Sequence, residues 1–154
     1  MLNIEIVSGN PDGSLNLNVY GRHSNGNNEA KRNWQVHWRV ISESNVQYIA
    51  DIKMKTGAGA PRSTDIFSGS GDQPGKHDSH GKHWKAKVNG GAPIHAEYNY
   101  DIKWVGEWGE KTYDPKISVK PSLIVNFPTL LIIGIISSIA TILAIGLWSK
   151  KIKR

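Results

Sequence analysis

Alternation of apolar and polar residues marks several segments of the chain as β-strands. Between positions 94 and 104 every even residue is apolar or aromatic, and every odd residue is polar. A period of two sustained over such a length is typical of a strand with one face on a core. The same alternation occurs at 2–6, 15–19, 34–40 and 84–88, and further strands are predicted at 46–55, 64–67 and 113–119.

Turn-forming residues separate these segments. Asparagine, glycine and proline gather at 10–13, 21–28, 57–61, 89–91 and 106–109, where they favour the chain reversals that connect neighbouring strands. No stretch before Pro121 keeps the 3.6-residue period of an amphipathic helix. Seven or eight short strands within residues 1–120, each with one apolar face, predict a soluble all-β domain built as a β-sandwich or a small barrel.

The order of these segments resembles that of the immunoglobulin-like sandwiches of small bacterial proteins. The resemblance covers about residues 30–120 and rests on the segments NWQVHWRV, NVQYIADIKM, DIF, KHWKAKV, AEYNYDIKW and YDPKISVKP. Tyr98 and Tyr100 lie on the penultimate segment, where such folds often place a corner tyrosine. The resemblance implies an immunoglobulin-like β-sandwich of about seven to eight strands, and it carries over no functional residue.

An uncharged segment follows the predicted domain and extends from position 121 to position 149. Its central part, residues 129–148, reads TLLIIGIISSIATILAIGLW and is apolar or small around its whole circumference. A helix of this length spans about 30 Å at about 1.5 Å per residue, which matches the hydrocarbon core of a bilayer. We therefore expect one transmembrane helix at about 129–148. The alternative is a buried core helix, for which the chain offers too little surrounding protein.

Interfacial residues follow this apolar segment. Trp148 is placed for the aromatic belt of a bilayer, and the tail 150–154 supplies cations for lipid headgroups. These cations are Lys150, Lys151, Lys153 and Arg154. The first residues lack the basic and apolar regions of a signal peptide, so we expect a single-pass, tail-anchored protein with its N-terminal domain in the cytoplasm. The extracytoplasmic orientation stays open, because lysines also precede the segment.

Small and hydroxylated residues recur along the predicted helix. Gly134 and Ser138 are four positions apart, as are Ser137 and Thr141. Small residues at this spacing allow two transmembrane helices to approach closely. The expected partners are therefore the lipid bilayer and either other membrane-protein subunits or a second copy of the chain.

The distribution of charge argues against nucleic acid as a partner. The chain has a formal net charge of +6, and most of this excess comes from the basic tail. The rest of the chain is close to balance and lacks the concentrated basic face of a nucleic-acid-binding domain. The chain also has no cysteine, which excludes disulfides, cysteine-ligated metal sites and thiol nucleophiles.

The most unusual segment is 68–83, SGSGDQPGKHDSHGKH, which contains no apolar side chain. We expect a loop here and no core strand. His77, His80 and His83 recur every three residues, and imidazole together with carboxylate binds Zn²⁺, Ni²⁺ or Cu²⁺. The glycines oppose a helix that would align the three rings. The segment is therefore interpreted as a solvated loop, a metal site at these histidines, or a surface that gains charge near about pH 6.

No catalytic motif is found in the chain. The glycine-rich stretch 57–60 lacks the lysine and hydroxyl that end a phosphate-binding loop. The carboxylates Asp51, Glu97 and Asp101 fall at outward-facing strand positions and are predicted to be solvated. These observations predict a protein that is not an enzyme and needs no cofactor.

Tryptophans divide into core candidates and one contact candidate. Trp34, Trp38, Trp84 and Trp104 share the phase of their apolar neighbours and are predicted to lie in the core. Trp108 lies in the turn 106–109, where an exposed indole is a candidate contact for a partner or for the bilayer surface.

Together these features predict a non-enzymatic accessory or binding subunit of a membrane-associated assembly. Two alternatives remain open. One is a metal- or pH-responsive sensor that uses the histidines of segment 68–83. The other is a membrane-perturbing effector that oligomerises through its transmembrane helix.

Overall fold

A computed structural model describes residues 1–121, and all of the regular structure in this range is β-strand. In chain order the strands are β1 (Leu2–Gly9), β2 (Leu15–Val19), β3 (Arg22–Ser24), β4 (Asn27–Lys31), β5 (Gln35–Val40), β6 (Val46–Met54), β7 (Asp72–Lys76), β8 (His83–Lys87), β9 (Glu97–Gly106), β10 (Gly109–Tyr113) and β11 (Lys116–Lys120). Within residues 1–121 there is no helix with the length and hydropathy to cross a bilayer. The helix predicted at 129–148 lies outside the described residues.

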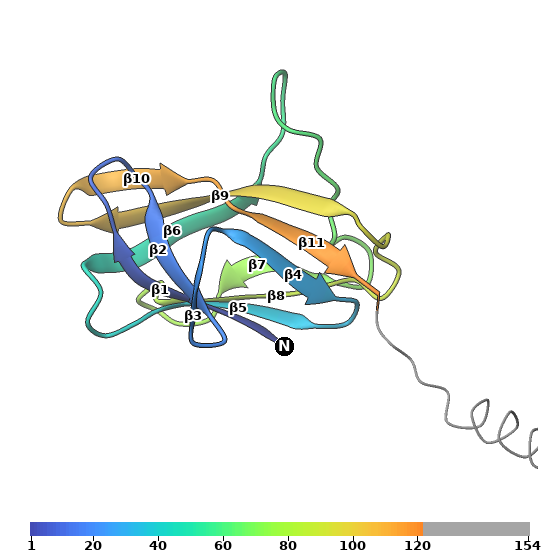
Figure 1. Ribbon diagram of the computed structural model, residues 1–154, viewed down its shortest axis with the longest axis horizontal. Helices are drawn as coiled ribbons and strands as arrows, with labels where there is room; N and C mark the ends of the chain where they lie inside the picture. Colours follow the sequence, from blue (N-terminus) through green and yellow to red (C-terminus); the bar gives the residue numbers. More distant parts are fainter. Residues whose placement is uncertain (122–154) are drawn as a thin grey trace, which may run out of the picture. The chain divides into compact units, whose positions relative to one another are not determined.

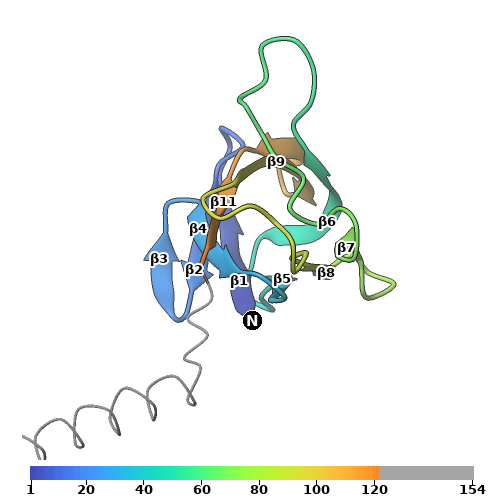
Figure 2. The same cartoon turned by 90° about the vertical axis from the view of Figure 1, so that its right-hand side faces the viewer.

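Two mixed sheets form the layers of a sandwich-like fold (Figures 1 and 2). The first sheet has the order β3-β2-β1-β5-β8-β7, and the second has the order β10-β9-β11-β4, with β6 also paired to β9. Each sheet contains one parallel pair, β1 with β5 in the first and β4 with β11 in the second. All other pairs are antiparallel. The predicted all-β class is therefore confirmed for the described residues.

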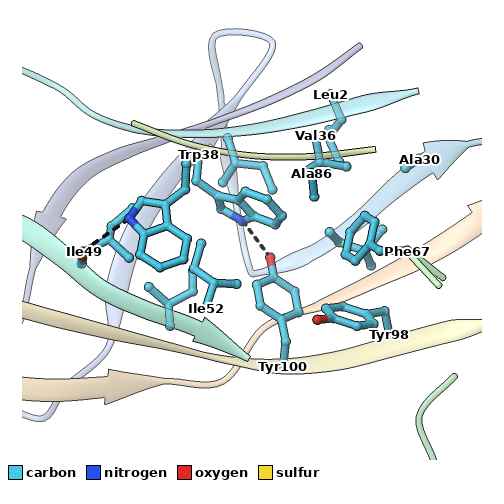
Figure 3. Close-up of a cluster of buried hydrophobic side chains, with 14 of the residues drawn as sticks. Leu2, Ala30, Val36, Trp38, Ile49, Ile52, Phe67, Ala86, Tyr98 and Tyr100 are labelled. Carbon is cyan, nitrogen blue, oxygen red and sulfur yellow. Dashed lines mark hydrogen bonds between the residues drawn. The ribbon is translucent and has the colours of Figure 1, made fainter. Parts of the chain in front are cut away.

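Aromatic side chains fill the centre of the core between the two sheets (Figure 3). The indole N–H of Trp38 donates a hydrogen bond to the Tyr100 hydroxyl at 3.1 Å, and both residues are completely buried. The Phe67 ring meets the Tyr98 ring edge to face, with 4.8 Å between ring centroids. Buried Trp and Tyr carry polar atoms that need partners, so the Trp38–Tyr100 bond fixes how β5 of one sheet faces β9 of the other.

Most of the predicted strands are present, and two predictions were wrong. The segment Thr64–Phe67 is not a strand. Its side chains Ile66 and Phe67 are instead fully buried and close the core from a loop. The segment predicted as one strand at 113–119 is divided between β10 and β11 around Pro115, because proline has no N–H to donate to a ladder.

The number of strands is also larger than predicted. Strands β3, β4, β7 and β10 lie where turn or loop residues dominate the sequence. Strand β9 begins at Glu97 rather than at Ile94. His95 has a φ of 64°, which interrupts the extended backbone and leaves Ile94 exposed. Among the tryptophans predicted to lie in the core, Trp38, Trp84 and Trp104 are buried, and Trp34 is half-buried against it.

Candidate interaction surface

Two histidine rings meet on the outward side of the first sheet. His37 lies on β5 and His83 on β8, in strands that pair antiparallel with Trp38 opposite Trp84. Because the two tryptophans point inward, the alternate positions of both strands point outward. The imidazole nitrogens His37 Nε2 and His83 Nδ1 are 3.1 Å apart, and the rings stack with their centroids 5.3 Å apart. At this separation one ring donates the hydrogen bond and the other accepts it.

Burial lowers the pKa of His37 below its usual value, and the nearby positive groups His83, Lys85, Arg39 and His77 lower it further. Neutral imidazole is therefore the form that the fold favours at this position. Acidification adds protons that the neighbouring ring and the cations resist. An anionic ligand bound at this surface would consequently favour protonation of the imidazoles.

We call the outward residues of β5 and β8 the imidazole face. It consists of Gln35, His37, Arg39, His83, Lys85 and Lys87, which pair across the two strands. Among residues 1–121, one acidic side chain makes an ion pair with this face. It is Glu5 of β1, whose carboxylate lies 2.5 Å from the Arg39 guanidinium. Lys85 and Lys87 make no such ion pair in the described part of the chain. The centre of the face is therefore basic even while both imidazoles are neutral.

A hairpin turn carries the other two histidines of the predicted metal site. His77 and His80 lie in the turn between β7 and β8, where the backbone N–H of His77 donates to the carbonyl oxygen of His83 at 2.8 Å. The carboxylate of Asp78 accepts from the Lys82 N–H at 3.0 Å and closes the turn. Segment 68–83 thus contains an edge strand as well as a loop.

The structure pairs His83 with His37, a residue that the sequence did not single out. Within residues 1–121 no group of three or more His, Asp or Glu side chains is arranged to hold a metal ion. The spacing along 68–83 pointed to His77 and His80 as neighbours of His83. The register of β5 against β8 instead supplies the nearer imidazole, and only knowledge of that pairing would have identified it.

A polar hollow of about 440 Å³ adjoins the imidazole face. Its polar lining side chains are Arg39, Ser42, Glu43, Lys82 and His83. Cations predominate in this lining, and the Glu43 carboxylate accepts a hydrogen bond from the Ser42 hydroxyl at 2.6 Å. The hollow is large enough for a small anionic group, and guanidinium, ammonium and imidazole are suitable donors for one.

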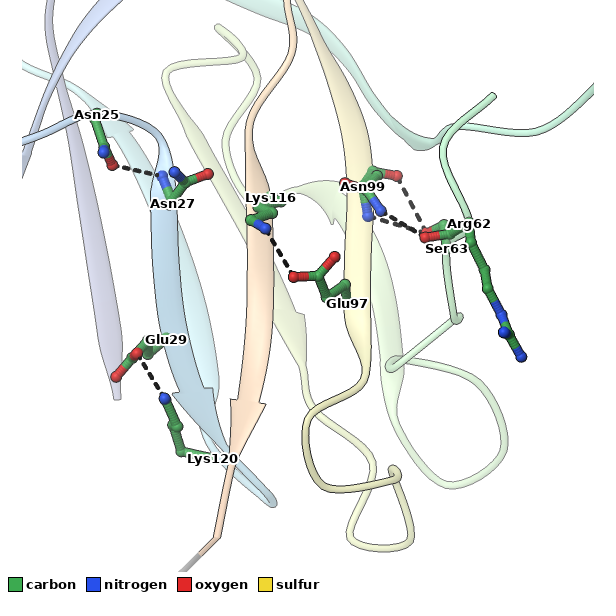
Figure 4. A network of polar contacts seen from close by, with 9 residues as sticks. All are labelled: Asn25, Asn27, Glu29, Arg62, Ser63, Glu97, Asn99, Lys116 and Lys120. Carbon is green, nitrogen blue, oxygen red and sulfur yellow. Dashed lines mark hydrogen bonds and ion pairs between the residues drawn. The ribbon is translucent and has the colours of Figure 1, made fainter. Parts of the chain in front are cut away.

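The outward side of the second sheet has a different character (Figure 4). Here lysines and carboxylates pair across neighbouring strands, Lys116 with Glu97 at 2.7 Å and Lys120 with Glu29 at 2.9 Å. Lys53 pairs with Asp51 at 2.7 Å. The carboxylates considered for acid–base chemistry are therefore ion-paired, as expected for a solvated sheet surface, and the charges of this side largely offset one another.

A second polar hollow, of about 470 Å³, lies beneath the segment that joins β6 to β7 and is lined by Asp51, Lys55 and Asp101 among others. The Lys55 ammonium contacts Asp114 at 2.5 Å and Asp101 at 3.5 Å. The hydrogen bond to Asp114 raises the pKa of Lys55. This lysine therefore stays charged, and its ammonium is paired with carboxylates of the same domain.

The contact tryptophan lies at the tip of the β9–β10 hairpin. Trp108 lies in the two-residue turn between β9 and β10 and is 37% exposed, so it remains a candidate contact. The other predicted contact and interface residues are Gly134, Ser138, Thr141, Trp148, Lys150, Lys151, Lys153 and Arg154, which lie outside the described residues. Comparison with known proteins adds no assignment, since no family model and no curated protein sequence matches the chain.

Proposed function

We propose that this chain is a non-enzymatic, single-pass membrane protein whose β-sandwich serves as a binding or accessory subunit of a membrane-associated assembly. One observation carries the proposal. A sandwich with its own core ends at Lys120, and an uncharged apolar segment of bilayer length follows it in the sequence. The first part supplies surfaces for binding, and the second supplies attachment.

We also infer that the sandwich is immunoglobulin-like. Strands β5, β8 and β7 pair in one sheet, while β6, β9 and β11 pair in the other, which matches the division of strands in that fold. The Trp38–Tyr100 hydrogen bond joins β5 to β9, where antibody domains have a disulfide between the sheets. Tyr98 precedes Tyr100 by two residues, as the corner tyrosine precedes the second cysteine there.

The proposed partners are the bilayer and other membrane-protein subunits or a second copy of the chain. Gly134, Ser138 and Thr141 would allow close helix packing. We propose that the sandwich faces the cytoplasm. The ion-paired carboxylates of the second sheet support a role without acid–base catalysis.

Membrane attachment is tested by extraction of cell membranes at alkaline pH. We expect the full chain to remain in the membrane pellet and the fragment 1–121 to remain in the supernatant. Protease treatment of sealed vesicles then reports which side the sandwich faces. A full chain that is soluble without detergent would overturn the proposal.

The subunit role is tested by gentle detergent extraction of the full chain followed by size-exclusion chromatography. We expect a complex that is larger than one chain in its micelle. Gly134→Leu with Ser138→Leu should reduce that size, while Ile145→Leu serves as a matched control. A monomer for the wild type at every concentration would contradict the subunit role and leave the anchor unaffected.

A further inference from the structure

We propose that the imidazole face docks on the anionic headgroups of a phospholipid bilayer and that acidification strengthens this docking. The inference deepens the proposed function. It rests on that function in one respect, because an anchored domain stays at a bilayer, where even weak contacts are populated.

The first step of the argument is the charge of the face and its border. Four cationic side chains lie on it or beside it: Arg39, Lys82, Lys85 and Lys87. Four acidic side chains come from the elements around it: Glu5 of β1, Glu43 of the loop after β5, Asp72 of β7 and Asp78 of the turn. With neutral imidazoles these groups nearly balance.

The second step is the number of imidazoles in the same area. His37 and His83 lie on the face, and His77 and His80 lie in the adjoining turn. Each of these imidazoles adds a positive charge when it is protonated. Carboxylates keep their negative charge down to about pH 4. Protonation of these imidazoles therefore moves the local charge from near balance to positive.

The third step is the fit between this surface and lipid headgroups. A sheet face presents its outward side chains in one layer, as a bilayer surface requires. The hollow lined by Arg39, Lys82 and His83 offers a place for one headgroup phosphate. The same cations disfavour a bound divalent metal between the two imidazoles, because they would repel it.

The size of the effect follows from the electrostatics of anionic membranes. Each positive charge close to such a surface strengthens binding about fivefold at moderate salt. One proton added to the His37–His83 pair should therefore strengthen binding about fivefold. An anionic surface also offsets the repulsion from Arg39 and Lys85, so binding draws protons onto the pair.

The test measures sedimentation of the fragment 1–121 with lipid vesicles at pH 7.5 and pH 5.0. This fragment contains the whole described core, so it should fold without the anchor. One vesicle preparation contains phosphatidylcholine alone, and the other contains phosphatidylcholine with phosphatidylglycerol, which stays anionic at both pH values. We expect binding to the anionic vesicles only, stronger by about fivefold or more at pH 5.0, and lost in high salt.

Variants assign the effect to this face. His37→Gln with His83→Gln should weaken binding about fivefold at pH 5.0 and leave it unchanged at pH 7.5. Lys85→Gln with Lys87→Gln should weaken it at both pH values. The matched controls are His95→Asn, which suits the positive φ of that residue, and Lys53→Gln with Lys103→Gln on the second sheet. Both controls should bind as the wild type does, and thermal unfolding verifies that every variant is folded.

Several outcomes would overturn the inference. These are no binding to anionic vesicles at pH 5.0, equal binding to neutral vesicles, and face variants that bind as the wild type does. Binding of polyglutamate without binding of vesicles would assign the face to an acidic protein instead. None of these results bears on alkaline extraction of the full chain, so failure of the lipid contact is distinguishable from failure of the anchor.

Discussion

The contact between Trp38 and Tyr100 joins the two sheets through a single buried hydrogen bond. Both side chains are inaccessible to water, and burial raises the pKa of Tyr100 far above its usual value. The hydroxyl therefore stays neutral and accepts from the indole N–H at 3.1 Å. If this acceptor is removed, no water can replace it, and the buried N–H loses its partner.

Tyr100→Phe is therefore expected to lower the free energy of unfolding by about 1–3 kcal/mol. Denaturant unfolding of the fragment 1–121 measures this change. Tyr113→Phe is the matched control, because the Tyr113 hydroxyl donates only to an exposed carbonyl at 3.4 Å. Its loss should stay below about 0.5 kcal/mol. Equal losses in the free energy of unfolding would show that the buried hydrogen bond contributes no more than the exposed one.

Among the elements, the connection between β6 and β7 belongs to no strand and is held to the sandwich by side-chain contacts and by backbone hydrogen bonds such as that from the Thr64 N–H to the Glu97 carbonyl at 2.8 Å. It projects from the end of β6 before it returns to β7 (Figure 1). Asn99 of β9 donates from its side-chain amide to the Arg62 carbonyl at 2.8 Å, and its backbone N–H donates to the Ser63 hydroxyl at 3.0 Å (Figure 4). These bonds fix the returning part of the connection.

Asn99→Ala should release this part of the connection. The loss of one hydrogen bond is worth about 1 kcal/mol, so local opening and trypsin cleavage after Arg62 should be about fivefold faster. Mass spectrometry of timed digests of the fragment 1–121 measures the rate. Glu97→Gln removes the ion pair with Lys116 on the same strand and should leave the rate unchanged. Similar rates in both variants would count against the tether.

The elements that sequence patterns missed have a common physical cause. Strand β7 (DQPGK) lies at the edge of its sheet and pairs only with β8, so it needs no buried face and shows no alternation. Strand β3 is likewise an edge strand of three residues. The opposite error occurred at 64–67, because an apolar run shows burial without showing whether a strand or a loop provides it.

For the whole molecule, stability should depend on pH through the same histidine that shapes the imidazole face. The pKa of His37 is lowered in the fold, chiefly by burial. The unfolded chain therefore takes up this proton at a higher pH than the folded chain does. Stability falls as the pH drops from about the unfolded value of 6.5 through the lower folded value.

His37→Gln should consequently show a smaller loss of stability than the wild type between pH 7.5 and pH 5.0. Thermal unfolding of the fragment 1–121 at several pH values measures this difference. Hydrogen bonds from Ser14 and Ser42 lower the pKa values of Asp12 and Glu43. The stability that these two carboxylates contribute is therefore lost only at more acidic pH. His23→Gln, in the exposed strand β3, is the control. Parallel pH curves for the wild type and His37→Gln would contradict the expectation.

The sequence by itself determined the all-β class and the positions of the strands that bury one face, because the period of two is a local consequence of burial. It also located the apolar segment at 129–148 and the basic tail. Only the tertiary structure decided which strands are neighbours. The pairing of β5 with β8 places His37 beside His83, and the fold leaves His77 and His80 in a turn. Strand pairing joins residues distant in the chain, and no local pattern of residues specifies their register.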